Sequence, residues 1–166
     1  MEDAHSIVEL IPRLRRYARA LVSDRASADD LVQDTLERAW TKFHLYRRGT
    51  DLRAWLFTVM HNVHVNQIRS SRAAAPLEDD MPELALRAPQ GDALMVRDVE
   101  RAIARLPVEQ REVLLLVTLE DFSYEQTVLA LGIPIGTVMS RLARAREKLR
   151  VMLLGATPGA KLQLVK

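Results

Sequence analysis

The sequence predicts an all-α protein in which a flexible linker joins two small helical domains, the C-terminal one a helix-turn-helix. Apolar residues recur at i, i+3, i+4 and i+7 in two stretches, which is the spacing that places them on one face of a helix. The stretch between them has three prolines, a glycine and several acids but no period. The expected segments are a first domain over 1–69, a linker over 70–92, a second domain over 93–154 and a C-terminal tail over 155–166.

The first domain should contain three helices. The apolar stripe of the first helix covers residues 7–21, and that of the third helix covers residues 52–69. Ser27 is expected to cap the second helix, with Asp30 at the third helical position, ahead of an apolar stripe over residues 31–43. Three helices with long apolar faces can bury one compact core.

The second domain begins after the linker and is also helical. Its run from 113 to 119 is apolar on nearly every side, so we expect it to be buried. Ser123 and Gln126 match a capping box that would open a short helix, and Gly132 is suited to end that helix in the left-handed conformation. The prolines of the linker predict that the two domains move relative to one another in the free protein.

Composition sets the broad class of the protein. The chain has 166 residues, 48% hydrophobic and 28% charged, with a formal net charge of +2, which is ordinary globular composition. With no cysteine, the chain can form no disulfide, thiolate nucleophile or cysteine zinc site. No apolar run approaches the roughly 18 residues of a membrane span, so we expect neither export nor membrane insertion. The sequence therefore predicts a cytoplasmic protein.

The segment "GIPIGTVMSRLARAREKLR", residues 132–150, follows the short capped helix after a glycine turn, the layout of a helix-turn-helix. One side of its helix is apolar, with Val138, Leu142, Ala145 and Leu149. The other side presents Thr137, Ser140, Arg141, Arg144 and Lys148. Arginine can pair bidentately with guanine, and a helix N-terminus can hold phosphate, so this side suits a DNA groove. A solvated basic helix end is the alternative, because arginine and lysine also favour helix C-termini.

The third helix presents a polar but lightly charged surface opposite its apolar stripe. This surface consists of Thr58, His61, Asn62, Val65, Arg69 and Arg72. Such residues suit contacts to single-stranded bases, although an ordinary solvated helix face has the same composition. His61 and His64 are three residues apart, but no clustered carboxylate or cysteine completes a metal site. We expect no metal and no cofactor.

The second helix carries an acidic stripe on the side away from its apolar residues. The acidic stripe consists of Asp30, Gln33, Asp34 and Glu37. Solvation explains it by default, but an acidic face that has a function should bind a basic protein partner, since it would repel DNA. The sequence has no glycine-rich phosphate loop, no G-x-S-x-G and no H-E-x-x-H. We therefore expect a protein that is not an enzyme and has no small-molecule substrate.

Three motifs in order make the chain resemble an extracytoplasmic-function (ECF) sigma factor, group 4 of the bacterial sigma-70 family. "ADDLVQDTLERAW" is similar to the family's polymerase-binding helix, and "RAWLFTVMHNVHVNQIR" is similar to its minus-10 helix. The segment from "LPVEQREVLLL" to "SRLARAREKL" resembles the family's region 4. The resemblance implies a sigma region 2 domain over 1–69 and a region 4 domain over 93–154. The acidic stripe would then bind the β′ clamp of core RNA polymerase.

The resemblance also assigns residues to the two promoter elements. The minus-10 set consists of Tyr46, Arg48, Gly49, Thr50, His61, Asn62, Asn66 and Arg69, with Trp55 packing beneath. The family flips a non-template base out of the minus-10 element as the duplex opens, which a pocket can drive by holding that base. The minus-35 set consists of Thr137, Ser140, Arg141, Arg144 and Lys148. Met139 stands where the family often has lysine or arginine, which leaves the promoter preference open.

By this resemblance the chain is an initiation subunit whose partners are core polymerase, through the β′ clamp and the β flap, and promoter DNA. An anti-sigma factor should control it and can hold such a protein at the membrane. Two alternatives remain. A stand-alone helix-turn-helix regulator would bind DNA as a dimer and would not need the acidic stripe. A DNA-independent interaction protein would be insensitive to Arg141→Ala and Arg144→Ala.

Overall fold

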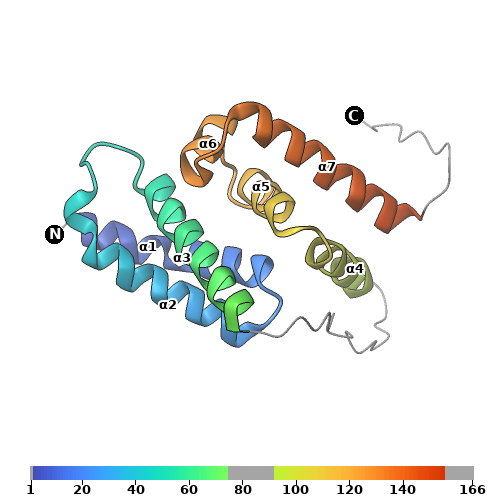
Figure 1. The fold of residues 1–166 in the computed structure, drawn as a ribbon, viewed down its shortest axis with the longest axis horizontal. Coiled ribbons are helices and arrows are strands. Elements are labelled where there is room, and N and C mark those ends of the chain that lie inside the picture. Colours follow the sequence, from blue (N-terminus) through green and yellow to red (C-terminus); the bar gives the residue numbers. More distant parts are fainter. Residues whose placement is uncertain (1, 75–91, 156–166) are drawn as a thin grey trace.

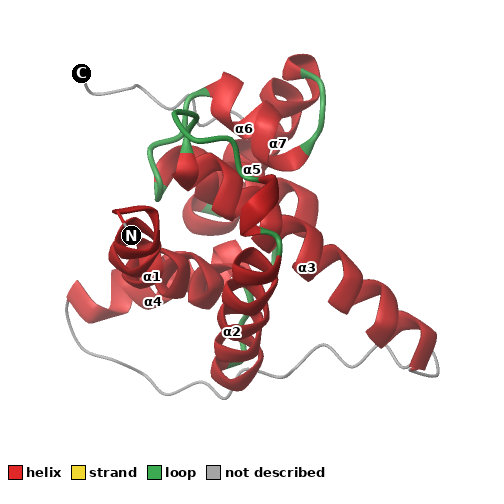
Figure 2. Ribbon diagram, turned by 90° about the vertical axis from the view of Figure 1, so that its left-hand side faces the viewer, coloured by secondary structure: helices red, strands yellow, loops and turns green. Residues whose placement is uncertain are grey.

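The helices form two groups that lie side by side (Figure 1). A computed structural model describes residues 2–74 and 92–155, and every regular element in those residues is a helix (Figure 2). The first group is α1 (Glu2–Leu21), α2 (Arg25–Thr41), the 3-10 turn η1 (Phe43–Leu45) and α3 (Leu52–Ala74). The second group is α4 (Asp92–Ala104), α5 (Val108–Thr118), α6 (Tyr124–Leu131) and α7 (Ile135–Leu154). The all-α prediction is confirmed, while most of the expected linker and tail lies outside the described residues.

The start of α2 and the end of α3 differ from the prediction. Asp24, not Ser27, is the N-cap residue of α2. The Asp24 carboxylate accepts two hydrogen bonds from Ser27, one from the backbone amide at 3.0 Å and one from the hydroxyl at 2.7 Å. These hydrogen bonds lower the pKa of Asp24. Serine and aspartate are both good caps, so the pattern S-D-R-A-S offered two candidates and the aspartate accepts both bonds. The first helix group extends beyond its expected end at residue 69, because α3 continues to Ala74.

The predicted helix-turn-helix is confirmed. The hydroxyl of Ser123 accepts the amide of Gln126 at 3.0 Å, and the amide of Ser123 donates to the Gln126 side chain at 2.9 Å. Gly132 ends α6 with φ of +64°, a left-handed conformation that favours glycine. The chain then turns by 103° into α7, an angle typical of this motif. α7 docks on the core through Val138 and its neighbours one and two turns on, Leu142 and Ala145.

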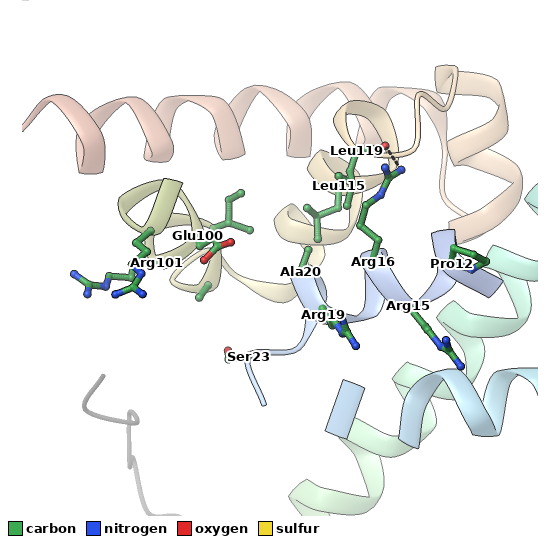
Figure 3. Close-up of a pocket in the computed structure, with 13 residues that line it drawn as sticks. Pro12, Arg15, Arg16, Arg19, Ala20, Ser23, Glu100, Arg101, Leu115 and Leu119 are labelled. Atoms are coloured by element: carbon green, nitrogen blue, oxygen red, sulfur yellow. Dashed lines mark hydrogen bonds between the residues drawn. The ribbon is translucent and has the colours of Figure 1, made fainter. Parts of the chain in front are cut away.

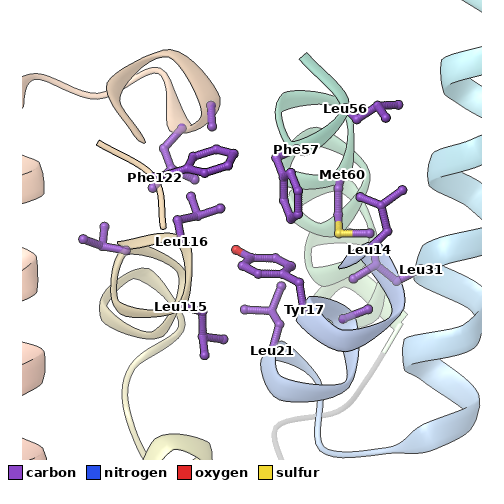
Figure 4. Close-up of a cluster of buried hydrophobic side chains, with 14 of the residues drawn as sticks. Leu14, Tyr17, Leu21, Leu31, Leu56, Phe57, Met60, Leu115, Leu116 and Phe122 are labelled. Atoms are coloured by element: carbon purple, nitrogen blue, oxygen red, sulfur yellow. The ribbon is translucent and has the colours of Figure 1, made fainter. Parts of the chain in front are cut away.

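The two groups share one apolar core, an arrangement that the sequence left open; the mobility of the domains in the free protein stays a prediction. α5 lies between α1 and α7 (Figure 1) and packs against both. Tyr17 of α1 contacts Phe57 of α3 with ring centroids 5.0 Å apart, and Phe57 contacts Phe122 after α5 at 5.3 Å. Leu115 and Leu116 of α5 complete this cluster (Figure 4). A helix that is apolar on nearly every side must be covered on both sides, and the first helix group supplies the second cover for α5.

Candidate nucleic-acid and protein interfaces

The acidic stripe lies on the exposed side of α2. Its members are all solvent-exposed, as the helical spacing predicts: Asp30, Gln33, Asp34 and Glu37. Three of them line a groove of about 770 Å³ between α2 and α3, namely Asp30, Asp34 and Glu37. Asp34 accepts a hydrogen bond from the side chain of Gln67 at 2.8 Å, which ties the two helices together. The stripe is thus a fixed anionic surface that a basic partner can contact.

The loop before α3 carries half of the predicted minus-10 set and is held by its own hydrogen bonds. The Tyr46 hydroxyl donates to the carbonyl of Thr50 at 2.7 Å, and the Thr50 hydroxyl donates to the carbonyl of Arg47 at 2.6 Å. Gly49 has φ of +87°, a conformation that side chains disfavour. The ring of Tyr46 packs on Trp55 with centroids 5.4 Å apart. The Thr50 hydroxyl therefore shapes this loop, and Arg48 is placed beside the turn.

A groove of about 460 Å³ beside that loop collects part of the remaining minus-10 set. It lies between the end of α2 and α3 and has Trp55 in its wall. Three predicted residues line it: Asn62, Asn66 and Arg69. Arg38 of α2 and Lys42, the C-cap residue of that helix, line it as well, and the prediction missed them. Their signal was present in the sequence, because two basic residues four apart at a helix end lie on one face.

His61 of the minus-10 set does not line this groove but faces α5. Its Nδ1 lies 2.9 Å from Oε1 of Glu112, and the Nδ1 of His64 lies 3.4 Å from the same oxygen. Because a carboxylate oxygen only accepts, each imidazole donates through Nδ1. The hydroxyl of Thr58, one turn before, donates to Ala54 within α3 and lies 3.4 Å from the carbonyl of Leu129 in α6. At His61 this side of α3 therefore faces α5, whereas Thr58 also lines the groove beside Trp55.

The minus-35 set lies along α7 and is mostly open to solvent. Ser140, Arg144 and Lys148 are exposed, and Thr137 near the helix start is half-buried. The Ser140 hydroxyl donates to the carbonyl of Thr137 at 3.2 Å. Arg141 differs, since it is half-buried and lines a cavity of about 200 Å³ together with residues of α3 and α5. The structure thus places four of the five predicted residues on one accessible face.

A further groove, of about 910 Å³, runs between α1 and α4 over α5 (Figure 3). Its rim is strongly basic, with Arg15, Arg16, Arg19, Arg97 and Arg101. Apolar side chains form most of the rest of its wall: Pro12, Ala20, Ile103, Ala104, Leu115 and Leu119. Glu100 is the single acid among its lining residues. No motif predicted this groove, because it combines residues of helices that are distant in the sequence.

Two buried carboxylates of the second helix group face the first. Burial would raise the pKa of Glu112, but hydrogen bonds from His61 and His64 and their charges outweigh it and lower that pKa. Burial raises the pKa of Glu120, although Arg16 donates to its Oε1 at 3.1 Å. Its Oε2 lies 3.9 Å from Nη1 of Arg13 and accepts no hydrogen bond from the described residues.

No group of three or more metal-binding side chains lies together in the described residues. Among the described helices, none is by itself long and apolar enough to span a membrane; only α6 and α7 taken together, across their 103° bend, have the length and composition.

Family models match each helix group separately. The model described as the Sigma2 domain of PhyR matches residues 7–61, and the model of Sigma-70 region 4 matches residues 97–149. The ECF RNA polymerase sigma factor EcfG of Rhodopseudomonas palustris is 36% identical over 149 residues, which cover 89% of this chain and 82% of that protein. This chain belongs to the ECF RNA polymerase sigma factors.

Other relatives agree with this family. SigL of Mycobacterium tuberculosis, an ECF RNA polymerase sigma factor, is 36% identical over 162 residues, covering 93% of this sigma factor and 89% of that one. The sigma factor RpoE of Bartonella quintana, solved with the anti-sigma factor NepR, is similar with a TM-score of 0.76 and 34% identity, covering 93% and 98% of the two chains. CnrH, solved with the cytosolic domain of CnrY, has a TM-score of 0.69 and 25% identity, covering 93% and 89%. The family prediction is confirmed.

Proposed function

We propose that this ECF sigma factor binds core RNA polymerase, recognises the minus-10 and minus-35 elements of a promoter and promotes melting of the first. It acts in the cytoplasm as a non-catalytic initiation subunit. Region 2 occupies 1–69, region 4 occupies 93–154, and residues 70–92 link them. The observation that carries the proposal is the presence, on three different helices, of one acidic and two DNA-compatible surfaces.

Charge supports the polymerase contact. The acidic stripe is exposed on α2, and three of its carboxylates, those of Asp30, Asp34 and Glu37, line a groove that is open to a partner. A surface of this sign repels DNA, so its partner in a transcription complex should be a basic protein surface. The β′ clamp of core polymerase is the partner that the family resemblance implies, and region 4 would contact the β flap.

Groove shape supports the minus-10 contact. The groove beside Trp55 has about 460 Å³, enough for one nucleobase, and Asn62 and Asn66 can hydrogen-bond the edge of a base. Arg38 and Lys42 on the opposite wall can bind the phosphates on either side of that base. Extruding a base costs a few kcal/mol, which these contacts would offset.

The open face of α7 supports the minus-35 contact. Ser140, Arg144 and Lys148 are exposed on the same side of the second helix of a helix-turn-helix. In this motif the second helix lies in the major groove, where arginine can pair with guanine O6 and N7. Met139 is also exposed on α7, next to Ser140 in sequence, and can contact a thymine methyl.

An anti-sigma factor is the third partner. The sigma factor RpoE of Bartonella quintana, which is similar to this chain, was solved in complex with the anti-sigma factor NepR. On this chain the groove between α1 and α4 has an arginine rim and an apolar wall. This combination fits an acidic amphipathic segment of a partner, because both its charges and its apolar side chains find complementary groups.

Run-off transcription with purified core polymerase and a promoter library tests the proposal. We expect the protein to direct selective initiation and Asp30→Arg to abolish it, because the substitution reverses a charge of the acidic stripe. Asp29→Arg is the matched control, since Asp29 is also exposed and is adjacent on α2 but does not line the groove.

The two variants separate the outcomes. Selective initiation that survives Asp29→Arg and is lost with Asp30→Arg supports polymerase binding through the stripe. Sequence-specific duplex binding without any stimulation of core polymerase would contradict the proposal and favour a stand-alone regulator.

A further inference from the structure

We propose that Glu112 holds this sigma factor in a closed arrangement by occupying, in place of DNA, the histidine side of α3. Promoter binding then requires His61 to exchange Glu112 for DNA. The inference rests on the proposed function, because it assigns His61 to the minus-10 contact. It adds an autoinhibitory contact that no sequence motif indicates.

The contact is well defined in geometry. His61 and His64 lie one turn apart on α3 and converge on a single oxygen of Glu112, at 2.9 Å and 3.4 Å. Glu112 is buried, with 5% of its side chain exposed, and so is His64, with 8%. His61 keeps 20% of its side chain exposed, so it forms the outer edge of the cluster. We call these three residues the α3–α5 cluster.

The cluster brings together residues that were assigned to different promoter elements. The cavity of about 200 Å³ beside it is lined by His61 and Arg69 of the minus-10 set and by Arg141 of the minus-35 set. At about 30 Å³ of liquid volume per water molecule, this space holds only a few waters and no DNA strand. The two elements are separated by about 25 base pairs, or ~85 Å at 3.4 Å per base pair. α3 and α7 must therefore separate before both elements can be bound.

Charge explains why Glu112 is the group that must be exchanged. Cationic or proton-donating groups surround the cavity on both sides, with Arg69 and Arg72 on α3 and Arg141 on α7, while Glu109 and Glu112 of α5 supply the anions. In the closed arrangement the Glu112 carboxylate occupies the position in which a DNA phosphate would accept hydrogen bonds from the same donors. The hydrogen bonds from both histidines keep the pKa of Glu112 low despite its burial, so it is an anion in this position.

The apolar core shared by the two groups cannot exchange its contacts for contacts with DNA, because DNA offers no group that would replace the packing of Phe57 or Phe122. A buried carboxylate, in contrast, is strongly destabilising once its partners leave unless water or new partners reach it. The α3–α5 cluster therefore favours an all-or-none choice between the closed arrangement and DNA.

A distance measurement tests the closed arrangement without DNA. The chain has no cysteine, so Thr41→Cys on α2 and Arg146→Cys on α7, both at exposed positions, can carry two spin labels. We expect a single narrow distance for the labelled parent. Glu112→Gln should move the closed-to-open ratio toward open by about tenfold, equivalent to ~1.4 kcal/mol. Glu125→Gln, which removes an exposed carboxylate of α6 that does not line this cavity, should leave the distance distribution unchanged. Equal distributions for all three proteins would overturn the proposal.

A second variant, on the α3 side of the contact, controls for a folding defect in Glu112→Gln. His61→Ala should shift the distances in the same direction, and the double variant should open no further than either single one. Additive shifts would show that the two residues act independently and would contradict the cluster.

Binding of a fluorescent single-stranded minus-10 oligonucleotide separates this inference from the proposed function. Glu112→Gln should bind about tenfold more tightly than the parent, whereas His61→Ala should open the protein without that gain. If no variant binds the oligonucleotide but the distances shift as expected, the minus-10 assignment fails and the closing contact stands. Unchanged distances with oligonucleotide binding would sink the closing contact alone.

Discussion

α3 and α7 were both expected to present a polar side to DNA, and the structure treats them differently. Along α7 the exposed side chains Ser140, Arg144 and Lys148 share one accessible face. Along α3 the predicted face divides, because Asn62 and Asn66 line an open groove while His61 turns to α5. One helix therefore shows its predicted surface in the closed protein, and the other shows half of it.

The difference follows from where each helix sits. α7 lies on the outside of the second group (Figure 1), and its fully buried residues are the apolar Val138, Leu142 and Ala145. α3 packs against α2 on one side and against α6 on another, so less of its circumference remains for solvent. A polar helix face is thus open only if no other element needs that side for its own packing.

The largest effect should come from the core that holds the two groups together. Phe57 is buried between Tyr17 and Phe122, so Phe57→Ala should lower the free energy of unfolding by about 3–5 kcal/mol. Urea denaturation followed by circular dichroism measures it. Leu129→Ala, at a side chain that is 68% exposed, is the control and should change little. A loss below ~1 kcal/mol for Phe57→Ala would mean that the groups separate easily, and α3 would then be as open as α7.

The second effect tests the exposed face of α7. Arg144→Ala should weaken binding of a minus-35 duplex by about 1–3 kcal/mol, because it removes a base or phosphate contact from the exposed face of α7. Asn62→Ala on α3 should leave duplex binding unchanged. Fluorescence anisotropy at fixed salt measures both. Equal losses for the two variants would show that α3 already contacts duplex DNA.

A smaller, pH-dependent effect tests the buried contact between the two helix groups at Glu120. Burial raises the pKa of Glu120, so the folded protein takes up a proton more readily than the unfolded chain and gains stability as the pH falls from neutral toward about 4.3. Glu120→Gln lacks this gain. The free energy of unfolding of the wild type should therefore rise relative to Glu120→Gln between pH 7 and pH 5 in urea denaturation. Glu125→Gln, at an exposed acid of α6, is the control and should follow the wild type.

The smallest effect sharpens the description of α7. Met139 is 53% exposed on α7, next to Ser140 in sequence, so Met139→Lys should add one phosphate contact without disturbing the core. The slope of log K against log salt for duplex binding should then steepen by about 0.9. Titrations at three salt concentrations measure the slope, and an unchanged value would place Met139 away from the DNA.

Much of the fold could be predicted because it depends on local pattern. The capping box at Ser123 and the left-handed Gly132 are fixed by residues within one turn, and both are confirmed. The buried side of α7 follows from helical period, as Val138 and Leu142 show. The predicted N-cap of α2 was wrong. Asp24 and Ser27 both suit an N-cap, and the sequence alone does not say which of the two accepts hydrogen bonds from the other.

The sequence by itself determined which segments are helical, which side of each helix is apolar and where the acidic stripe lies, since period, caps and charge act over a few residues. Only the tertiary structure decided that the two groups share a core, that His61 meets Glu112 across 51 positions of the chain, and that arginines of α1 and α4 rim one groove. The physical reason is that contacts between groups depend on the shape and charge of two complete surfaces. No local pattern encodes how two such surfaces meet.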